Sequence, residues 1–282
     1  FKNFRTVRLF KTPGAAVKKI KLYLYLLFNP SVCLDFGNRT PFFGRNIVFL
    51  HDIYCRVFPE DFRSAKDRRI MKKSCRMYKR IAKKARLICT VSEFSKKQIM
   101  DYYGVPEEKI RVIYNGFEHI NSISADNGIF TRLGGLKKKE FYFTLGSLSL
   151  RKNLKWIADH AELYPNETFV VSGTMLKNFI PPELQKLKTL PNVILAGYLS
   201  DGEVKALMQT CKAFVLPSYF EGFGIPPLEA LACGAPVIIS NAASLPEIYG
   251  NAAHYIDPSK PDVDLDALLK EPVAAPEPLF EK

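Results

Sequence analysis

The stretch Phe214–Pro236, FVLPSYFEGFGIPPLEALACGAP, decides the fold, because it predicts a strand, a glycine-containing loop and a helix in direct succession. Its apolar start predicts a buried strand that ends at Pro217. Pro226 and Pro227 fit the first turn of a helix, where a missing N–H costs no hydrogen bond. A strand that leads directly into a helix is typical of α/β proteins with a parallel sheet.

The same alternation continues on both sides of this stretch. Strands are expected at 46–50, 86–91, 109–114, 141–145, 168–172, 193–196, 213–216 and 237–240, and helices at 92–104, 152–163, 182–190, 201–211 and 227–232. Strands that alternate with helices are joined by crossovers and lie parallel. The sequence therefore predicts an α/β fold with two doubly wound domains that face each other across a cleft.

Charge and polarity divide the chain into two parts. Residues 1–130 carry 26 Lys and Arg against 11 Asp and Glu, whereas residues 131–282 carry 15 against 17, so the first part accounts for the net charge of +13. The polar segment Asn121–Lys139 is the best linker candidate. We therefore place an N-terminal domain at 1–125 and a C-terminal domain at 126–282. A basic first domain suits an anionic partner.

The densest basic stretch is Arg63–Arg86, where 12 of 24 residues are Lys or Arg. Residues at helical spacing predict the packed face: Ile70, Ser74, Met77, Ile81, Ala85 and Ile88. The other faces carry Lys66, Arg69, Lys73, Arg76, Arg80 and Lys83. Such a helix has either a solvated basic face or a face that rests on anionic lipid or a lipid-linked phosphate. Nucleic acid is disfavoured, because no recognised nucleic-acid motif accompanies the helix.

Composition argues against several classes of protein. With 47% hydrophobic and 24% charged residues, the chain is typical of a globular protein. Its longest strongly apolar run, Leu22–Phe28, is far shorter than the roughly 20 residues that span a bilayer. No secretory signal is evident at the N-terminus. The six cysteines lack zinc-ligand spacing, and free thiols in the cytoplasm are a simpler interpretation than three disulfides.

Two carboxylates, Glu221 and Glu229, flank the start of the helix in the opening stretch. The glycines between them let backbone N–H groups approach a ligand closely, and a helix N-terminus favours a diphosphate. The carboxylates can accept several sugar hydroxyls. Taken singly, Glu221 is also explained as an exposed loop acid and Glu229 as a favourable partner of the helix dipole. A glycosidase pair would require two facing carboxyl groups, which spacing in sequence cannot show.

Seven residues separate Glu221 from Glu229, and this resembles the E-x(7)-E motif of retaining glycosyltransferases of family 4. The surrounding SYFEGFGIPPLEALACGAPVI matches that family almost residue by residue. Five further segments match in the same order: HDIYCRVFPEDF at 51–62, TVSEFSKKQI at 90–99, KIRVIYNGF at 109–117, TLGSLSLRKNL at 144–154 and SLPEIYGNAAHYIDP at 244–258. The resemblance implies a GT-B fold, with the active site between two Rossmann-like domains. It also implies transfer from a nucleotide-sugar with retention of configuration and without a required metal or other cofactor.

The resemblance implies roles for individual residues. Glu221 would hold hydroxyls of the donor sugar, and Glu229 would bind the ribose. Lys152 matches the family's diphosphate-binding lysine, and His51 would contact the donor sugar close to the reacting carbon. Backbone amides would help to hold the sugar and the phosphates, at Gly222, Phe223 and Gly224. A cation beside the leaving diphosphate stabilises charge that grows in the transition state.

Gly146 and Arg151 complete the predicted donor site. Many family members carry an arginine immediately after this glycine, whereas here Ser147 follows Gly146, and Arg151 is the residue that could compensate. The family's first strand with its glycine-rich loop is not visible before Phe1, and its closing helices are not visible after Lys282. We therefore expect an incomplete N-terminal domain and a chain truncated at both ends.

These observations favour a cytoplasmic retaining hexosyltransferase that builds a surface polysaccharide or glycolipid at the inner face of the membrane. Its expected partners are a nucleotide-sugar, a glycan or lipid-linked acceptor, and an anionic membrane that contacts the basic helix at 63–86. One alternative is a non-catalytic protein that binds nucleotide-sugars or glycans on the same scaffold. Another is a polyanion-binding protein, whose affinity would fall steeply with salt.

Overall fold

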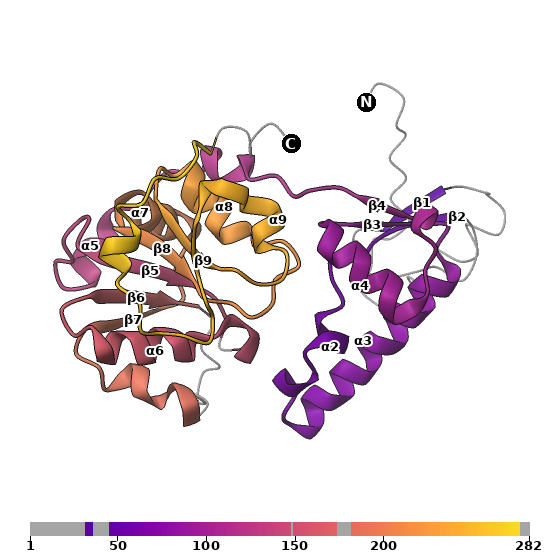
Figure 1. Cartoon of the computed structure of the whole chain (residues 1–282), viewed down its shortest axis with the longest axis horizontal. Helices are drawn as coiled ribbons and strands as arrows, with labels where there is room; N and C mark the ends of the chain where they lie inside the picture. The colour runs from indigo at the N-terminus through magenta and orange to yellow at the C-terminus, as the bar shows by residue number, and fades with distance from the viewer. Residues whose placement is uncertain (1–31, 36–44, 148, 174–181, 277–282) are drawn as a thin grey trace, which may run out of the picture.

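The computed structural model describes residues 32–35, 45–147, 149–173 and 182–276. These residues form two α/β domains, each built on its own parallel sheet (Figure 1). The α/β class and the two-domain organisation predicted from the alternation of strands and helices are therefore confirmed.

The first domain contains a four-stranded parallel sheet in the order β1-β2-β3-β4. Its strands are β1 (Val32–Asp35), β2 (Arg45–Phe49), β3 (Leu87–Thr90) and β4 (Ile110–Val112). Its helices are α2 (Tyr54–Val57), α3 (Ala65–Lys84) and α4 (Glu93–Tyr103), with 3-10 turns η1 (Pro59–Asp61) and η2 (Glu107–Lys109). Three of the strands lie within two residues of their predicted bounds. The sequence analysis did not predict β1.

The second domain contains a six-stranded parallel sheet in the order β10-β9-β8-β5-β6-β7. Its strands are β5 (Phe141–Leu145), β6 (Thr168–Ser172), β7 (Val193–Gly197), β8 (Ala213–Leu216), β9 (Val237–Ser240) and β10 (His254–Ile256). Its helices are α6 (Leu154–Leu163), α7 (Asp201–Thr210), α8 (Ile225–Ala232), α9 (Leu245–Tyr249) and α10 (Leu265–Leu268), with 3-10 turns η4 (Leu150–Lys152), η5 (Pro182–Lys188) and η6 (Gly250–Ala252). Counted from β5, this is the Rossmann strand order. The chain adds β6 and β7 on one side of β5 and then adds β8, β9 and β10 on its other side.

The central strands of the second sheet are covered on both faces. Every residue of β8 and β9 is buried, as expected for a parallel sheet between two layers of helices. Successive residues of β5 enter different cores: Phe141 and Phe143 pack with one cluster of apolar side chains, and Tyr142 packs with the other. The carboxyl ends of β5 and β8 are thereby fixed within a rigid sheet.

The chain passes from the first domain to the second at residues 113–117, directly after β4 (Figure 1). The turn η3 (Glu118–Ser122) and the short helix α5 (Gly128–Arg132) that follow already pack on the second domain. Ile129 is fully buried in the core of that domain, and Lys205 on α7 donates to the backbone oxygen of Ile120 at 2.8 Å. The segment 121–139, the linker candidate of the sequence analysis, therefore packs on the second domain, because Ile129 lies in that core and Phe130, Leu133 and Leu136 pack against it.

Helix α3 is amphipathic as predicted, and most of the predicted stripe is packed: Ile81, Ala85 and Ile88 are buried, and Ser74 and Met77 are half-buried. The structure differs from the stripe at Ile70, which is 49% exposed, and at Tyr78, which is buried although the stripe does not include it. The reason is the position of neighbouring elements: the Tyr78 ring meets the Tyr103 ring edge-on at 6.4 Å, and the Cys75 thiol reaches the backbone oxygen of Cys55. The predicted basic face is exposed at Lys66, Arg69, Lys73, Arg76 and Lys83, and half-buried at Arg80.

Candidate active site at the domain junction

Sheet order brings two loops together where the strand order reverses. The loop after β5 runs from Gly146 to η4 and carries Arg151 and Lys152, and the loop after β8 carries Glu221. The two loops meet because β5 and β8 are hydrogen-bonded neighbours. In sheets of this kind, ligands bind at this switch point. The structure thus gathers three of the residues that the sequence singled out.

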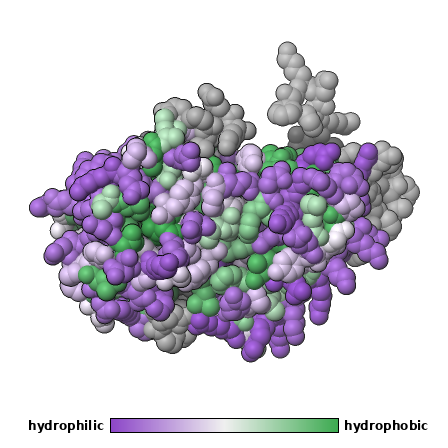
Figure 2. All heavy atoms as spheres, in the orientation of Figure 1, coloured by the Kyte–Doolittle hydropathy of each residue, from purple (hydrophilic) through white to green (hydrophobic). Residues whose placement is uncertain are grey.

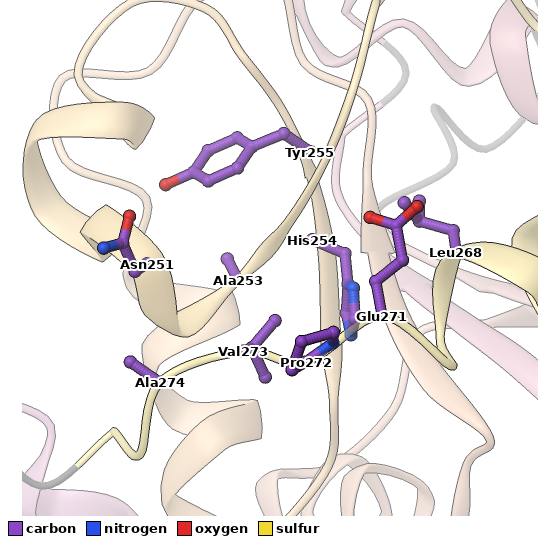
Figure 3. Close-up of a pocket in the computed structure, with 9 residues that line it drawn as sticks. All are labelled: Asn251, Ala253, His254, Tyr255, Leu268, Glu271, Pro272, Val273 and Ala274. Atoms are coloured by element: carbon purple, nitrogen blue, oxygen red, sulfur yellow. The ribbon is translucent and has the colours of Figure 1, made fainter.

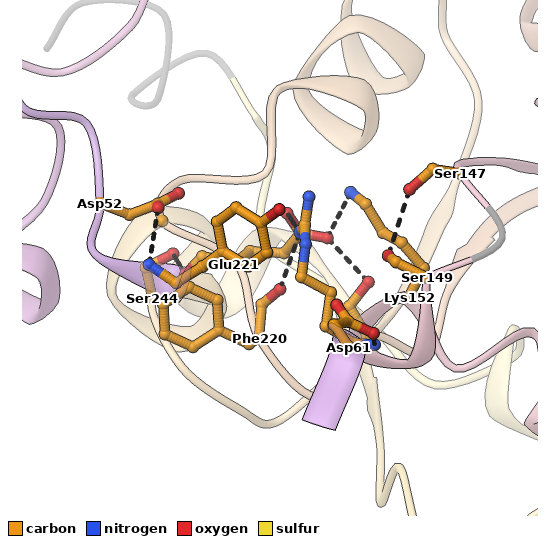
Figure 4. Close-up of polar contacts among 12 residues, drawn as sticks. Asp52, Asp61, Ser147, Ser149, Lys152, Phe220, Glu221 and Ser244 are labelled. Carbon is orange, nitrogen blue, oxygen red and sulfur yellow. Dashed lines mark hydrogen bonds and ion pairs between the residues drawn. The ribbon is translucent and has the colours of Figure 1, made fainter. Parts of the chain in front are cut away.

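Glu221 lies between two cations (Figure 4). Its side chain is only 8% exposed, and its Oε1 accepts hydrogen bonds from Lys152 Nζ at 2.6 Å and from Ser218 Oγ at 2.8 Å. Its Oε2 accepts from an Arg151 guanidinium nitrogen at 3.2 Å. A buried carboxylate is stable only when it is paired in this way. Arg151, whose role the sequence left open, is therefore a direct partner of Glu221.

Asn153 fixes the direction of the preceding cations. It adopts the left-handed conformation, with φ of 53°, between η4 and α6. Asparagine tolerates this conformation better than most residues. Its amide nitrogen donates to the backbone oxygens of Pro217 at 2.9 Å and Pro258 at 2.8 Å. These bonds tie the start of α6 to the ends of β8 and β10, so Lys152 projects toward Glu221 from a fixed backbone.

The glycine loop after Glu221 is closely packed. Gly224 begins α8 with φ of 90°, and a Cβ atom there would lie 2.6 Å from Leu245 Cδ2. A Cβ atom on Gly222 would lie 2.9 Å from the Asp52 carboxylate. Between them, Phe223 is buried, with its ring 6.1 Å from that of Tyr114. Only glycine fits at these two positions, which brings the loop backbone against the first domain.

The first domain contributes His51 and Asp52 from the end of β2. His51 is exposed, and its ring lies 6.4 Å from that of Phe49. The next residue, Asp52, is the one that reaches the glycine loop, and its Oδ1 accepts from the Tyr54 N–H at 3.0 Å. Burial raises the pKa of the Asp52 carboxyl, while the Tyr54 N–H and the Arg151 charge act in the opposite direction. Sequence reasoning missed Asp52, although it adjoins His51 in a matching segment.

Asp61 joins the two domains on the other side of Arg151. It lies on η1, and its Oδ1 accepts from the backbone N–H of Leu150 at 2.5 Å and of Arg151 at 3.4 Å. The Arg151 guanidinium also lies 5.0 Å from the centre of the Tyr54 ring. Burial raises the pKa of the Asp61 carboxyl, and the two N–H groups partly offset this effect. The first domain therefore helps to fix the loop that carries the cations.

Glu229, the predicted ribose ligand, lies on α8 and is already engaged. Its Oε1 is 2.5 Å from His119 Nε2, and the two side chains are 14% and 55% exposed. His119 lies on η3, next to the segment that crosses between the domains. The sequence analysis missed His119 because its partner lies 110 residues away in the chain. Gly146 lies close to the stem of Lys152 and donates its N–H to the Ser172 oxygen at 2.9 Å.

A separate cavity of about 570 Å³ lies away from this cluster, beside β10 (Figure 3). It is lined by His254, Glu271 and the loop residues around them, and burial lowers the pKa of His254. None of its lining residues belongs to the Glu221 cluster, so we do not place the donor there. Among the described residues, no group of three or more His, Cys, Asp and Glu side chains could hold a metal. No described helix is long and apolar enough to cross a membrane.

Solved structures show a similar fold. Sucrose-phosphate synthase from Thermosynechococcus elongatus aligns with 90% of this chain and 67% of its own chain, with a TM-score of 0.67 and 17% identity. Anabaena HepE in complex with UDP-glucose aligns with 89% of this chain and 65% of its own, with a TM-score of 0.62 and 20% identity. These likenesses confirm the predicted GT-B arrangement of two Rossmann-like domains.

Sequence comparisons identify the family. The O-antigen chain mannosyltransferase B of Escherichia coli is 31% identical over 234 residues, which are 79% of this chain and 59% of that relative. The O-antigen chain mannosyltransferase RfbU of Salmonella typhimurium is 29% identical over 80% of this chain and 63% of its own length. The chain thus spans about three-fifths of these relatives. The model of Glycosyltransferase Family 4 matches residues 44–119, and that of Glycosyl transferases group 1 matches residues 129–270. The chain therefore belongs to the group 1 glycosyltransferases.

Proposed function

We propose that this protein is a retaining glycosyltransferase that moves a hexose from a nucleotide-sugar to a glycan or lipid-linked acceptor in surface polysaccharide synthesis. The observation that carries the proposal is the buried Glu221 carboxylate between Lys152 and Arg151 at the sheet's switch point. This cluster combines an acceptor for sugar hydroxyls with cations for a diphosphate. The named relatives that are O-antigen mannosyltransferases support the same class of acceptor.

When the donor binds, its diphosphate and sugar replace the ion pairs that Glu221 forms with Lys152 and Arg151. The diphosphate of a nucleotide-sugar takes the Lys152 ammonium and the Arg151 guanidinium, and the released Glu221 oxygens accept the hydroxyls of the sugar. No charge is left buried without a partner at any stage, so the exchange avoids the large cost of an isolated buried ion. As the bond to the sugar breaks, negative charge grows on the diphosphate, and the same cations stabilise it.

The other residues predicted for the donor site contact the remaining parts of the donor. Glu229 on α8 binds the ribose, and the amides of Gly222, Phe223 and Gly224 hold the sugar and phosphates. His51 contacts the sugar from the first domain. Because Arg151 and Lys152 supply the positive charge that metal-dependent transferases take from a divalent ion, we propose that transfer needs no metal. Transfer in excess EDTA at an unchanged rate is the expected result.

Nucleotide binding tests the donor site first. We expect one nucleotide family among UDP, GDP, dTDP and CMP to raise the melting temperature of this chain, since a ligand at about 100 times its Kd stabilises a fold by about 2.7 kcal/mol. Glu229→Ala should abolish the shift. Binding followed by transfer of radiolabelled sugar to a lipid-linked acceptor would establish the enzyme. Binding without transfer would instead indicate a nucleotide-sugar-binding protein, and the absence of both would contradict the proposal.

Two lysines on neighbouring turns offer a matched comparison. Lys152 is 11% exposed and pairs with Glu221, whereas Lys155 is 59% exposed and pairs with Asp159 on its own helix. We expect Lys152→Ala to lower kcat by about 10²- to 10³-fold, as for other groups that stabilise transition-state charge. Lys155→Ala should change it less than about twofold, because a surface ion pair contributes little. Equal effects of the two substitutions would contradict the assignment of Lys152.

We also propose that α3 rests on an anionic membrane surface, where a lipid-linked acceptor would lie. Hydrophilic side chains cover the edge of the first domain along which α3 runs (Figure 2). Arg69, Arg76 and Lys83 are exposed and lie seven residues apart, so they share one face of the helix. Each basic residue near an anionic surface contributes about 1 kcal/mol.

Vesicle co-sedimentation tests this contact. The chain should bind vesicles of phosphatidylcholine with phosphatidylglycerol, and bind pure phosphatidylcholine weakly. The triple substitution Arg69→Glu, Arg76→Glu and Lys83→Glu should remove this preference. A control with the same change of charge replaces three exposed lysines of the second domain by Glu: Lys137, Lys188 and Lys260. Equal loss in both variants would show an effect of net charge alone and would contradict a role for α3.

A further inference from the structure

Helix α9 of the second domain reaches the start of helix α4 of the first. The Glu247 carboxylate accepts the backbone N–H of Glu93 at 2.7 Å through one oxygen and that of Phe94 at 2.8 Å through the other. The Tyr114 hydroxyl donates to the same carboxylate at 3.2 Å. These bonds join residues 153 and 154 positions apart in the sequence. Glu247 therefore completes the N-terminal cap of a helix that belongs to the other domain.

The chemistry of this contact favours a specific fit over a general attraction of charge. The first N–H groups of a helix have no partner within the helix, and an anion at this end is stabilised by the helix dipole. On α4, the Ser92 hydroxyl accepts the N–H of Ser95, and Glu247 accepts the two N–H groups before it. At the same helix start, the Glu93 side chain pairs with Lys96 at 3.2 Å, and the two aimed N–H groups are the contacts of α4 with Glu247.

The same helix start also holds the loop of the candidate active site. The hydroxyls of Ser92 and Ser95 both donate to the Gly222 oxygen, at 2.7 Å and 3.3 Å. Directly before α9, the Ser244 hydroxyl donates to the Glu221 oxygen at 3.0 Å. Hydroxyls at the start of α4 and directly before α9 therefore donate to the backbone oxygens of two adjacent residues, Gly222 and Glu221. The bond between Glu247 and α4 therefore lies beside the contacts that hold the first domain at the Glu221 loop.

We infer that Glu247 is a positioning residue that locks the first domain against the second, so that His51 and Asp52 face the Glu221 cluster. The role in transfer rests on the proposed function, whereas the lock itself does not. Glu247 touches neither donor nor acceptor in this proposal. It acts through α4, which carries no donor-binding residue, and its removal should loosen the domain arrangement while the donor site on the second domain is retained.

Three variants separate this role from others. Glu247→Ala removes both hydrogen-bond acceptors, Glu247→Gln keeps one and removes the charge, and Glu93→Gln is the control, because Glu93 sits at the same helix start with a 58% exposed side chain. Small-angle scattering reports the domain arrangement, a melting shift with the cognate nucleoside diphosphate reports the donor site, and steady-state kinetics report transfer. Glu247→Gln keeps the test valid if Glu247→Ala fails to fold.

We expect Glu247→Ala to increase the radius of gyration, to lower kcat at least tenfold and to leave nucleotide Kd and donor KM within threefold. Glu247→Gln should lie between Glu247→Ala and the wild type, and Glu93→Gln should match the wild type. An unchanged scattering profile would overturn the proposal. So would a fall in nucleotide affinity as large as the fall in kcat, since Glu247 would then act on the donor site. If the wild type transfers no sugar, the scattering result still decides whether Glu247 locks the domains, and the failure then belongs to the proposed function.

Discussion

At the scale of single residues, the site depends on backbone positions as much as on charges. Gly224, directly before α8, and Gly234, shortly after it, both have left-handed backbones, with φ of 90° and 80°. They differ in their surroundings. A Cβ atom on Gly224 would lie 2.6 Å from Leu245 Cδ2, whereas no described heavy atom lies within 4 Å of the corresponding Cβ position on Gly234. The pair therefore separates the cost of conformation from the cost of overlap.

We expect Gly234→Ala to lower the free energy of unfolding by about 1–2 kcal/mol, the cost of a left-handed alanine. Gly224→Ala should lower it by about 1–3 kcal/mol more, because the added methyl group overlaps Leu245. Denaturant unfolding of both variants measures the difference. Gly224→Ala should also weaken nucleotide binding, since Gly224 begins the helix that carries Glu229. Equal destabilisation by the two substitutions would show that Leu245 moves aside freely.

At the scale of elements, α3 provides a test with one residue type in two environments. Ile81 is fully buried and Ile70 is 49% exposed, although both belong to the stripe predicted from helical spacing. Ile81→Ala should destabilise the fold by about 2–5 kcal/mol, as for other buried isoleucines. Ile70→Ala should stay within about 0.5 kcal/mol of the wild type. Urea midpoints of the two variants measure this, and a large effect at Ile70 would mean that the packed face extends to the start of the predicted stripe.

The differences at Ile70 and Tyr78 show what periodicity can and cannot predict. Spacing identified the helix, its basic face and most of its packed face, but the burial of Tyr78 depends on Tyr103, whose position comes from tertiary structure. Glu221 and Lys152 could be found because the resemblance gives each of them a role within one segment. Glu247 also lies in a matching segment, 244–258, but neither its contact nor that of His119 could be predicted, because their partners lie 153 and 110 residues away. Long-range pairs of this kind carry no local pattern for sequence reasoning to detect.

At the scale of the whole molecule, polar and aromatic contacts between the domains converge on the two loops of the site. Asp61 receives the N–H of Leu150, Ser92 donates to Gly222, and Glu247 caps α4. Aromatic rings meet at the same place, Phe58 with Tyr219 at 6.4 Å and Phe94 with Phe220 at 5.8 Å. The polar contacts can exchange with water, which permits relative motion of the domains. These contacts fix the two domains relative to each other at the point where donor and acceptor would meet. Titration of Asp61, which takes part in them, tests this arrangement.

Burial raises the pKa of Asp61 above its ordinary value of 3.8. At a pH below that ordinary value, the carboxyl is protonated in both folded and unfolded states and has no pH-linked effect. As the pH rises through the folded-state pKa, the unfolded state ionises more easily, so stability is lost. Asp61→Asn removes this pH dependence of stability. Because Oδ2 is buried and has no hydrogen-bond partner among the described atoms, an amide group at this position also lowers stability by an amount that does not change with pH. The melting temperature of Asp61→Asn relative to the wild type should therefore rise with pH, whatever its absolute value.

Asp67 at the start of α3 is a control of opposite sign. The Ser64 hydroxyl and N–H donate to its carboxylate and lower its pKa, so the carboxylate stabilises the fold above the unfolded-state pKa, and this contribution is lost as the pH falls through the folded-state pKa. The melting temperature of Asp67→Asn relative to the wild type should therefore fall as the pH rises. Calorimetric scans between about pH 2 and about pH 7, which extend below and above the ordinary carboxyl pKa of about 4, measure both slopes. If the relative melting temperatures of both variants changed with pH in the same direction, burial between the domains would not raise the pKa of Asp61. Water would then reach the Asp61 carboxyl more freely than its contacts indicate.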